Sequence, residues 1–196
     1  MKSIALALCV LLIPVPGFSQ APPPPFAVKQ FNDGVYWIVL ESFAYQIGQT
    51  TMRVEVPKGF VTDFASIPED FRREFGPTGK YARAAVIHDY LYWTQGCSKE
   101  QADKLLLLAM TESDVPYVIR RSIYLAVRIG GELAWRRNQT ERKTGLPRII
   151  PDASLNIGSL DVWSKYQQQL FDKGVRPEPS ITQSPAYCAA DERDLY

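Results

Sequence analysis

Histidine and cysteine are scarce in this chain of 196 residues. His88 is the single histidine, and the three cysteines, Cys9, Cys97 and Cys188, lie far apart. A structural zinc site takes about four Cys and His ligands at short spacings, so the sequence excludes this class of site. A glycine-rich phosphate loop and a serine nucleophile elbow are missing too. Any proton transfer by an imidazole near neutral pH must therefore occur at His88.

Neither sign of charge is in excess. The 22 basic side chains are matched by 21 acidic ones, so there is no basic field to gather nucleic acid, and we expect no nucleic-acid partner. Hydrophobic residues at 46% and charged residues at 22% are close to the averages of globular proteins. This composition excludes a wholly disordered chain.

Long apolar runs are also missing. The best candidate, Ile4 to Pro14, is shorter than the roughly 20 residues that cross a bilayer. Lys2 before it and the small residues around Ser19 after it predict a signal peptide over residues 1–19. We therefore expect an exported protein, periplasmic or secreted, whose mature chain has no transmembrane span. An uncleaved N-terminal anchor is the alternative.

Export would leave Cys97 and Cys188 in an oxidising compartment. Two thiols there predict a disulfide, which would fasten the C-terminal tail to the turn after the helix that carries His88. Two free thiols are the alternative. Between the signal peptide and the folded part, Pro22 to Pro25 predict an extended proline-rich spacer over residues 20–26.

The first folded region is rich in β-branched and aromatic residues. The turn signal Asn32-Asp33-Gly34 predicts a hairpin of residues 27–31 with 35–43, and two further strands are expected at 45–47 and 52–56. A small antiparallel sheet should therefore occupy roughly residues 26–62.

Three helices are expected next. The first begins at Lys80 and carries His88, and the second begins with a capping box between Ser98 and Gln101. Their short connection makes them antiparallel. The third should run from a cap at Asp114, with Pro116 in its first turn, to about Arg137. Gly130-Gly131 inside it either kinks the helix or lets another chain segment approach closely.

These patterns predict an α+β fold, in which a small N-terminal antiparallel sheet packs on a three-helix unit and an irregular tail follows. We assign residues 27–145 to a single domain and residues 146–196 to a C-terminal extension, with a short helix over 160–171 and a loose end from Gly174.

Candidate site residues converge on the first two helices. His88 lies on the apolar stripe of its helix, and Asp103 on the next helix can meet it across the hairpin. The loop that starts at Thr62 adds Asp63 and Ser66, which either stabilise the loop through backbone amides or take part in the site.

An ordered set of short motifs carries a family resemblance. They are VPKGFVTDFASIP at 56–68, GKY at 79–81, HDYLY at 88–92 and AD at 102–103. The chain resembles, over about residues 27–136, the domain of unknown function 1353 family, often encoded by tailed phages and prophages. That resemblance implies a phage-related origin and no particular activity.

The helix pair is also similar to the catalytic core of secreted phospholipases A2, above all the small prokaryotic ones. This similarity implies that His88 is the general base for an attacking water, that Asp103 orients its imidazole, and that Tyr92 supports Asp103. It also implies calcium as cofactor, with Asp89 as a ligand and Asp63 as a further one, and a lipid or another small ester as substrate.

Two functions are therefore open. The first is a His/Asp-dependent, calcium-assisted hydrolase of ester bonds. The second is a non-enzymatic binding or structural module, in which the bond between His88 and Asp103 only clasps the two helices together.

Overall fold

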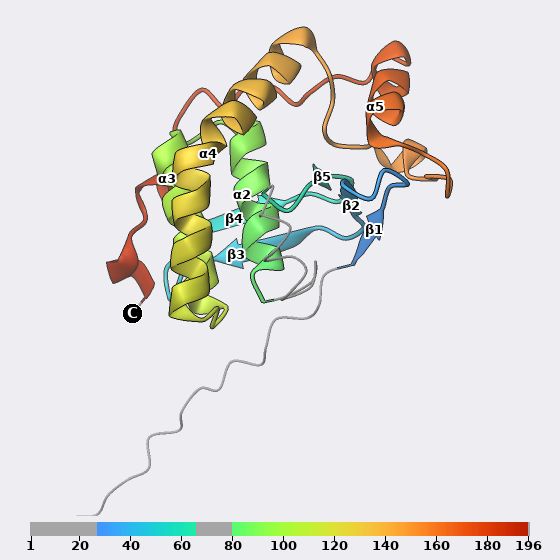
Figure 1. Ribbon diagram of the computed structural model, residues 1–196. Helices are drawn as coiled ribbons and strands as arrows, with labels where there is room; N and C mark the ends of the chain where they lie inside the picture. Colours follow the sequence, from blue (N-terminus) through green and yellow to red (C-terminus); the bar gives the residue numbers. More distant parts are fainter. Residues whose placement is uncertain (1–26, 66–79, 196) are drawn as a thin grey trace, which may run out of the picture.

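The computed structural model describes residues 27–65 and 80–195 (Figure 1). The predicted signal peptide over 1–19, the proline-rich spacer over 20–26 and Ser66 lie outside the described residues. Within the described ranges the order of elements, strands first and helices after, confirms the α+β class.

Within residues 27–65 and 80–195, five short strands form two antiparallel sheets. In the first, β2 (Trp37–Val39) lies between β1 (Val28–Gln30) and β5 (Val61–Thr62), and in the second, β3 (Phe43–Gln46) pairs with β4 (Arg53–Val56). β1, β2 and β4 lie within the predicted strands, whereas β3 begins two residues before its predicted start and β5 was not predicted as a separate strand. They divide between two sheets because β5 takes the second edge of β2, so that β3 has only β4 to pair with.

The next two helices form the predicted hairpin, and the first of them packs on the sheets. They are α2 (Ala82–Thr94) and α3 (Lys99–Glu112). The capping box at Ser98 is confirmed, because its side chain accepts a hydrogen bond from the Gln101 N–H while Gln101 Oε1 accepts one from the Ser98 N–H. Ala84 and Ala85 let α2 approach its neighbours closely, and both are fully buried.

The third helix, α4 (Tyr117–Thr144), lies across α2 and α3 (Figure 1). It is longer than predicted and does not begin at Asp114. Asp114 has a left-handed backbone with φ of 52° and closes the turn after α3, so Pro116 becomes the N-cap residue. The C-cap is Gly145, with φ of 83°, because glycine takes the left-handed conformation without strain.

The chain after α4 returns to the sheet. Residues 148–150 run beside β5, where the Val61 N–H donates to the Arg148 carbonyl (3.0 Å) and the Ile150 N–H donates to the Gly59 carbonyl (2.9 Å). A second apolar cluster then joins the short helix α5 (Trp163–Asp172) to Phe31 of the first hairpin. This return fixes the position of Arg148.

The tail from Gly174 contains only short 3-10 turns, at Ala186–Ala189 and Glu192–Leu195, as the prediction of an irregular end requires. A disulfide joins Cys97, in the α2–α3 connection, to Cys188, with a Cα–Cα distance of 5.3 Å. Within the ranges that the structure describes, no helix has both the length and the apolar character needed to cross a bilayer.

Candidate functional site

Asp103 is the centre of a buried hydrogen-bond network between α2 and α3. Its Oδ1 lies 2.9 Å from His88 Nε2 and accepts a bond from the Tyr92 hydroxyl (2.6 Å), while its Oδ2 accepts one from Lys99 Nζ (2.9 Å). His88 and Tyr92 are one turn apart on α2, and their rings lie in contact with centroids 4.1 Å apart. The structure thus brings together the predicted pair, His88 and Asp103, and the predicted support, Tyr92.

Burial and hydrogen bonds determine the protonation states of Asp103 and His88. Burial raises the pKa of Asp103, but the bonds from His88, Tyr92 and Lys99 outweigh it and hold the pKa below its ordinary value. Burial lowers the pKa of His88 below its ordinary value of 6.5, against the opposing effect of Asp103. At neutral pH a neutral imidazole therefore donates its Nε2 proton to an ionised Asp103.

The second ring nitrogen of His88, Nδ1, takes no part in the bond to Asp103. Within the described part of the chain, Nδ1 is buried and has no hydrogen-bond partner. In a neutral imidazole with its proton on Nε2, Nδ1 carries the lone pair and can accept a proton. His88 is thus held through Nε2, while Nδ1 is a buried acceptor without a partner among the described residues.

A second carboxyl group, that of Asp89, organises the loop after β5. Its Oδ2 accepts bonds from the Thr62 hydroxyl (2.5 Å) and from the Asp63 N–H (3.1 Å). Burial, together with the neighbouring charge of Asp63, raises the pKa of Asp89 to about 7. Phe64 and Ala65 follow with φ of 59° and 60°, a left-handed backbone that costs on the order of 1–3 kcal/mol at each non-glycine residue. The bonds to Asp89 hold this strained loop in place.

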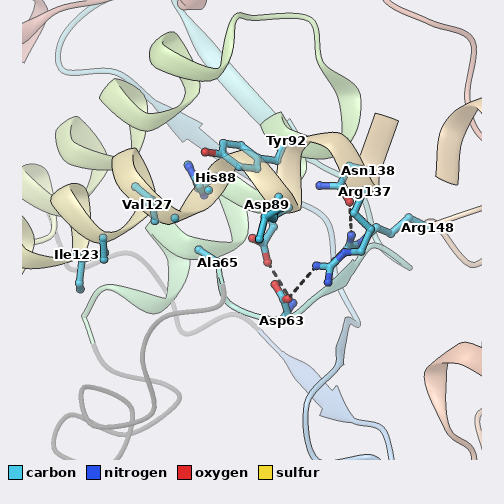
Figure 2. Close-up of a pocket in the computed structure, with 15 residues that line it drawn as sticks. Asp63, Ala65, His88, Asp89, Tyr92, Ile123, Val127, Arg137, Asn138 and Arg148 are labelled. Atoms are coloured by element: carbon cyan, nitrogen blue, oxygen red, sulfur yellow. Dashed lines mark hydrogen bonds and ion pairs between the residues drawn. The ribbon is translucent and has the colours of Figure 1, made fainter. Parts of the chain in front are cut away.

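Two arginines stand beside the carboxylates. Arg137 of α4 lies with Nη2 3.7 Å from Asp63 Oδ2. Arg148 is 3% exposed and donates from Nη1 to Asn138 Oδ1 (2.5 Å) and from Nε to the Val61 carbonyl (2.9 Å). Figure 2 shows Asp63 and Asp89 close to these cationic side chains.

These groups line one cavity of about 280 Å³ (Figure 2). Its wall on the α4 side is mainly apolar, and its polar residues come from four different segments of the chain. The polar lining consists of Asp63, His88, Asp89, Tyr92, Arg137, Asn138 and Arg148. The cavity can therefore hold a small apolar group with a polar or anionic end.

The predicted site residues take different positions around this cavity. Tyr92 and the metal candidates Asp63 and Asp89 line it together with His88, whereas Asp103 is fully buried and outside its lining. Thr62 binds Asp89 rather than facing the cavity itself.

The donor set around Asp89 does not suit calcium. The ion takes six to eight oxygen ligands, whereas Oδ2 of Asp89 is bonded to a hydroxyl and an amide donor, and a guanidinium stands beside Asp63. In the described ranges no three or more acidic, His or Cys side chains form a group that could hold a metal ion. The chemistry proposed below is therefore derived from the protein's own side chains.

Sequence reasoning missed Lys99, Arg137, Asn138 and Arg148. Lys99 was open to prediction, because it precedes Asp103 by four residues on one helix. The other three reach the cavity through the length of α4 and the return of the chain beside β5, and no local pattern predicts either.

Comparison with known families identifies part of the chain. Residues 37–127 match the family model described as Protein of unknown function (DUF1353). Residues 37–127 of the chain thus form a DUF1353 region. This region carries the whole network around Asp103, and it ends before Arg137, Asn138 and Arg148. No curated protein and no solved structure matches the chain.

Proposed function

We propose that this protein, which contains a DUF1353 region, is an exported hydrolase of carboxylic esters, with His88 as the general base. The observation that carries the proposal is the unpartnered Nδ1 of a neutral His88, on a ring that lines the cavity and is oriented through Nε2 by Asp103. A base held by a carboxylate on its far nitrogen has a fixed tautomer and a stabilised imidazolium form.

The reaction needs one water and one ester in the cavity. His88 Nδ1 takes a proton as the water oxygen adds to the ester carbonyl, and the imidazolium is stabilised by ionised Asp103. The tetrahedral intermediate then breaks its bond to the leaving oxygen, and the imidazolium returns the proton to that oxygen. A carboxylic acid and an alcohol result, and His88 is neutral again.

The negative charge that develops on the carbonyl oxygen needs a cationic partner. Arg137 and Arg148 line the same cavity as His88, and Arg148 is fixed by bonds to Asn138 and to the Val61 carbonyl. We assign the stabilisation of this oxyanion to these guanidinium groups, above all to the buried Arg148, because a charge that is already held in place acts without reorganisation. The same guanidinium groups can bind the carboxylate product of the reaction.

The proposal is tested by His88→Asn with short-chain p-nitrophenyl esters as substrates. Loss of the base should lower kcat by about 10² to 10⁴, with a circular dichroism spectrum like that of the wild type. Asp103→Asn should lower kcat by a comparable factor, because the imidazole loses its orienting acceptor. Because burial lowers the pKa of His88, the acid limb of the wild-type kcat/KM profile should have its midpoint below pH 6.5. Equal activity of His88→Asn and the wild type would refute the proposal.

A second function is favoured by one observation: the His88 side chain is only 2% exposed. In a phage-derived binding or structural module, the bonds at Asp103 would serve only to clasp α2 to α3. In that case His88→Asn should lower the free energy of unfolding by about 1–3 kcal/mol, and no panel of esters should be hydrolysed by the wild type.

Export is supported by the signal-peptide pattern over residues 1–19 and by the disulfide between Cys97 and Cys188. Expression in a bacterium with subsequent fractionation and mass spectrometry of the N-terminus tests it. A protein recovered from the cytoplasm with Met1 intact and both thiols free would contradict export.

A further inference from the structure

The outer face of α4 carries an apolar stripe that no described segment of the chain covers. Val118, Leu125, Ile129 and Leu133 follow one another at helical repeats of seven and four residues, and their side chains are 74%, 56%, 83% and 81% exposed. The stripe is about 22 Å long at 1.5 Å per residue. A run of large apolar side chains on one helix face is unusual on a monomer surface and marks a place that binds something.

Positive charge borders the stripe. The whole of α4 has seven basic residues and two acidic ones, and one of the acidic residues, Glu132, is paired with Arg136 (2.7 Å). Arg121 and Arg128 lie along one side of the stripe by their helical positions and stack on Tyr117 and Tyr124. An apolar helix face with arginines and tyrosines at its border suits the boundary between acyl chains and anionic headgroups.

The stripe is continuous with the cavity. Leu133 belongs to the stripe and also lines the cavity, and the neighbouring lining residues Gly130 and Arg137 are exposed. The cavity therefore meets solvent along the edge of α4 beside the stripe. A surface that covers the stripe would also face the entrance to the cavity.

We infer that the outer face of α4 docks on a bilayer surface with anionic headgroups, and that the ester hydrolysed in the cavity is an acyl ester of such an amphiphile. The substrate class rests on the proposed function, whereas the docking does not. A second copy of the chain is a poorer occupant, because a symmetric contact through α4 brings two basic faces together.

The docking is tested by sedimentation with vesicles of dialkyl-ether lipids, which an esterase cannot cleave. One set contains only ether phosphatidylcholine, and the other adds ether phosphatidylglycerol. We expect at least tenfold stronger binding to the anionic set. Leu125→Asp/Ile129→Asp should lose at least tenfold of this binding, and Arg121→Gln/Arg128→Gln should lose the preference for the anionic set.

The matched control is Leu160→Asp. Leu160 is 81% exposed, like the stripe residues, but lies outside α4, so its replacement should leave vesicle binding unchanged. All variants are made in the full chain, so that any contribution of residues 4–14 is equal in each. Equal binding of the wild type and Leu125→Asp/Ile129→Asp would overturn the docking. So would a wild-type dimer that dissociates in this variant and ignores vesicles.

The hydrolase and the docking can be refuted independently of each other. Leu125→Asp/Ile129→Asp should hydrolyse short soluble esters at the wild-type rate, because neither Leu125 nor Ile129 lines the cavity that contains His88. Binding of ether vesicles without hydrolysis of any ester would leave the docking intact and refute the hydrolase. Hydrolysis of soluble esters without vesicle binding would refute the docking and leave the hydrolase intact.

Discussion

The hydroxyl group of Tyr92 on α2 lies directly against Gly131 of α4. A Cβ atom built at position 131 would lie 2.5 Å from Tyr92 Oη and 3.3 Å from Lys99 Cε. Both of these side chains bind Asp103. The missing side chain at position 131 therefore makes room for the network that holds His88.

Gly131→Ala should consequently disturb the network, whereas Gly130→Ala should not. A Cβ at position 130 would meet nothing within 4 Å, so Gly130→Ala should stabilise the protein by about 0.5–1 kcal/mol through helix propensity. Gly131→Ala should destabilise it by about 1–3 kcal/mol, because Tyr92 must move. Urea denaturation of the two variants measures the contrast. Equal stabilisation by both alanines would mean that Tyr92 does not occupy this position.

Asp89→Asn should change how stability depends on pH. The pKa of Asp89 is raised from 3.8 to about 7, so the folded state keeps the proton more firmly than the unfolded state. The stability that this gives is complete below about pH 4 and is lost as pH rises through 7. The wild type should thus lose stability relative to Asp89→Asn between pH 5 and 8, by about 2–3 kcal/mol. The titration of His88 contributes equally to the pH dependence of stability in both proteins, so it cancels when the two free energies of unfolding are subtracted.

Chemical denaturation at several pH values measures this difference. A constant gap between the wild type and Asp89→Asn from pH 5 to pH 8 would show that Asp89 is ionised throughout.

Removal of the disulfide should weaken the fold substantially. Cys97 and Cys188 are separated by 91 positions, and closure of a loop of this size is worth about 3–5 kcal/mol in the chain-entropy model. Cys97→Ala/Cys188→Ala should lower the free energy of unfolding by about this amount, and reduction of the wild type should reproduce the change. A variant as stable as the oxidised wild type would argue against the crosslink.

Calcium should not stabilise the protein. A ligand that binds only the folded state raises the midpoint of thermal unfolding with its concentration, so a true site would reveal itself at millimolar calcium. Because hydrogen-bond donors and Arg137 surround Asp89 and Asp63, we expect the same midpoint with calcium and with a chelator. A rise in midpoint that Asp63→Asn abolishes would restore the calcium-assisted mechanism.

The sequence predicted the parts of this structure that depend on neighbours in the chain. Turn chemistry at Asp33 placed the first hairpin, where Asp33 Oδ1 accepts from the Val35 and Tyr36 amides. The capping box at Ser98 placed the start of α3, and two helices with a short connection brought His88 to Asp103. Each of these features follows from spacing along one or two elements.

The features that the sequence did not predict depend on tertiary contacts. The start of α4 was wrong because Asp114 closes the preceding turn with a left-handed backbone instead of capping the helix. The separation of the strands into two sheets was not foreseen, because it depends on β5 reaching the edge of β2. The position of Arg148 was not predicted, because it depends on the pairing of residues 148–150 with the sheet. Val61, whose carbonyl accepts from Arg148 Nε, lies more than 80 positions earlier in the sequence.

The boundary of the family match runs through the cavity itself. His88, which we propose as the base, Asp103 and the strained loop fall within residues 37–127, while Arg137, Asn138 and Arg148 come from the chain beyond Val127. The family match thus covers the proposed proton-transfer groups and leaves the cationic end of the cavity outside. Substitutions within residues 128–150 are accordingly a direct way to change which molecule the cavity admits while His88 and Asp103 stay in place.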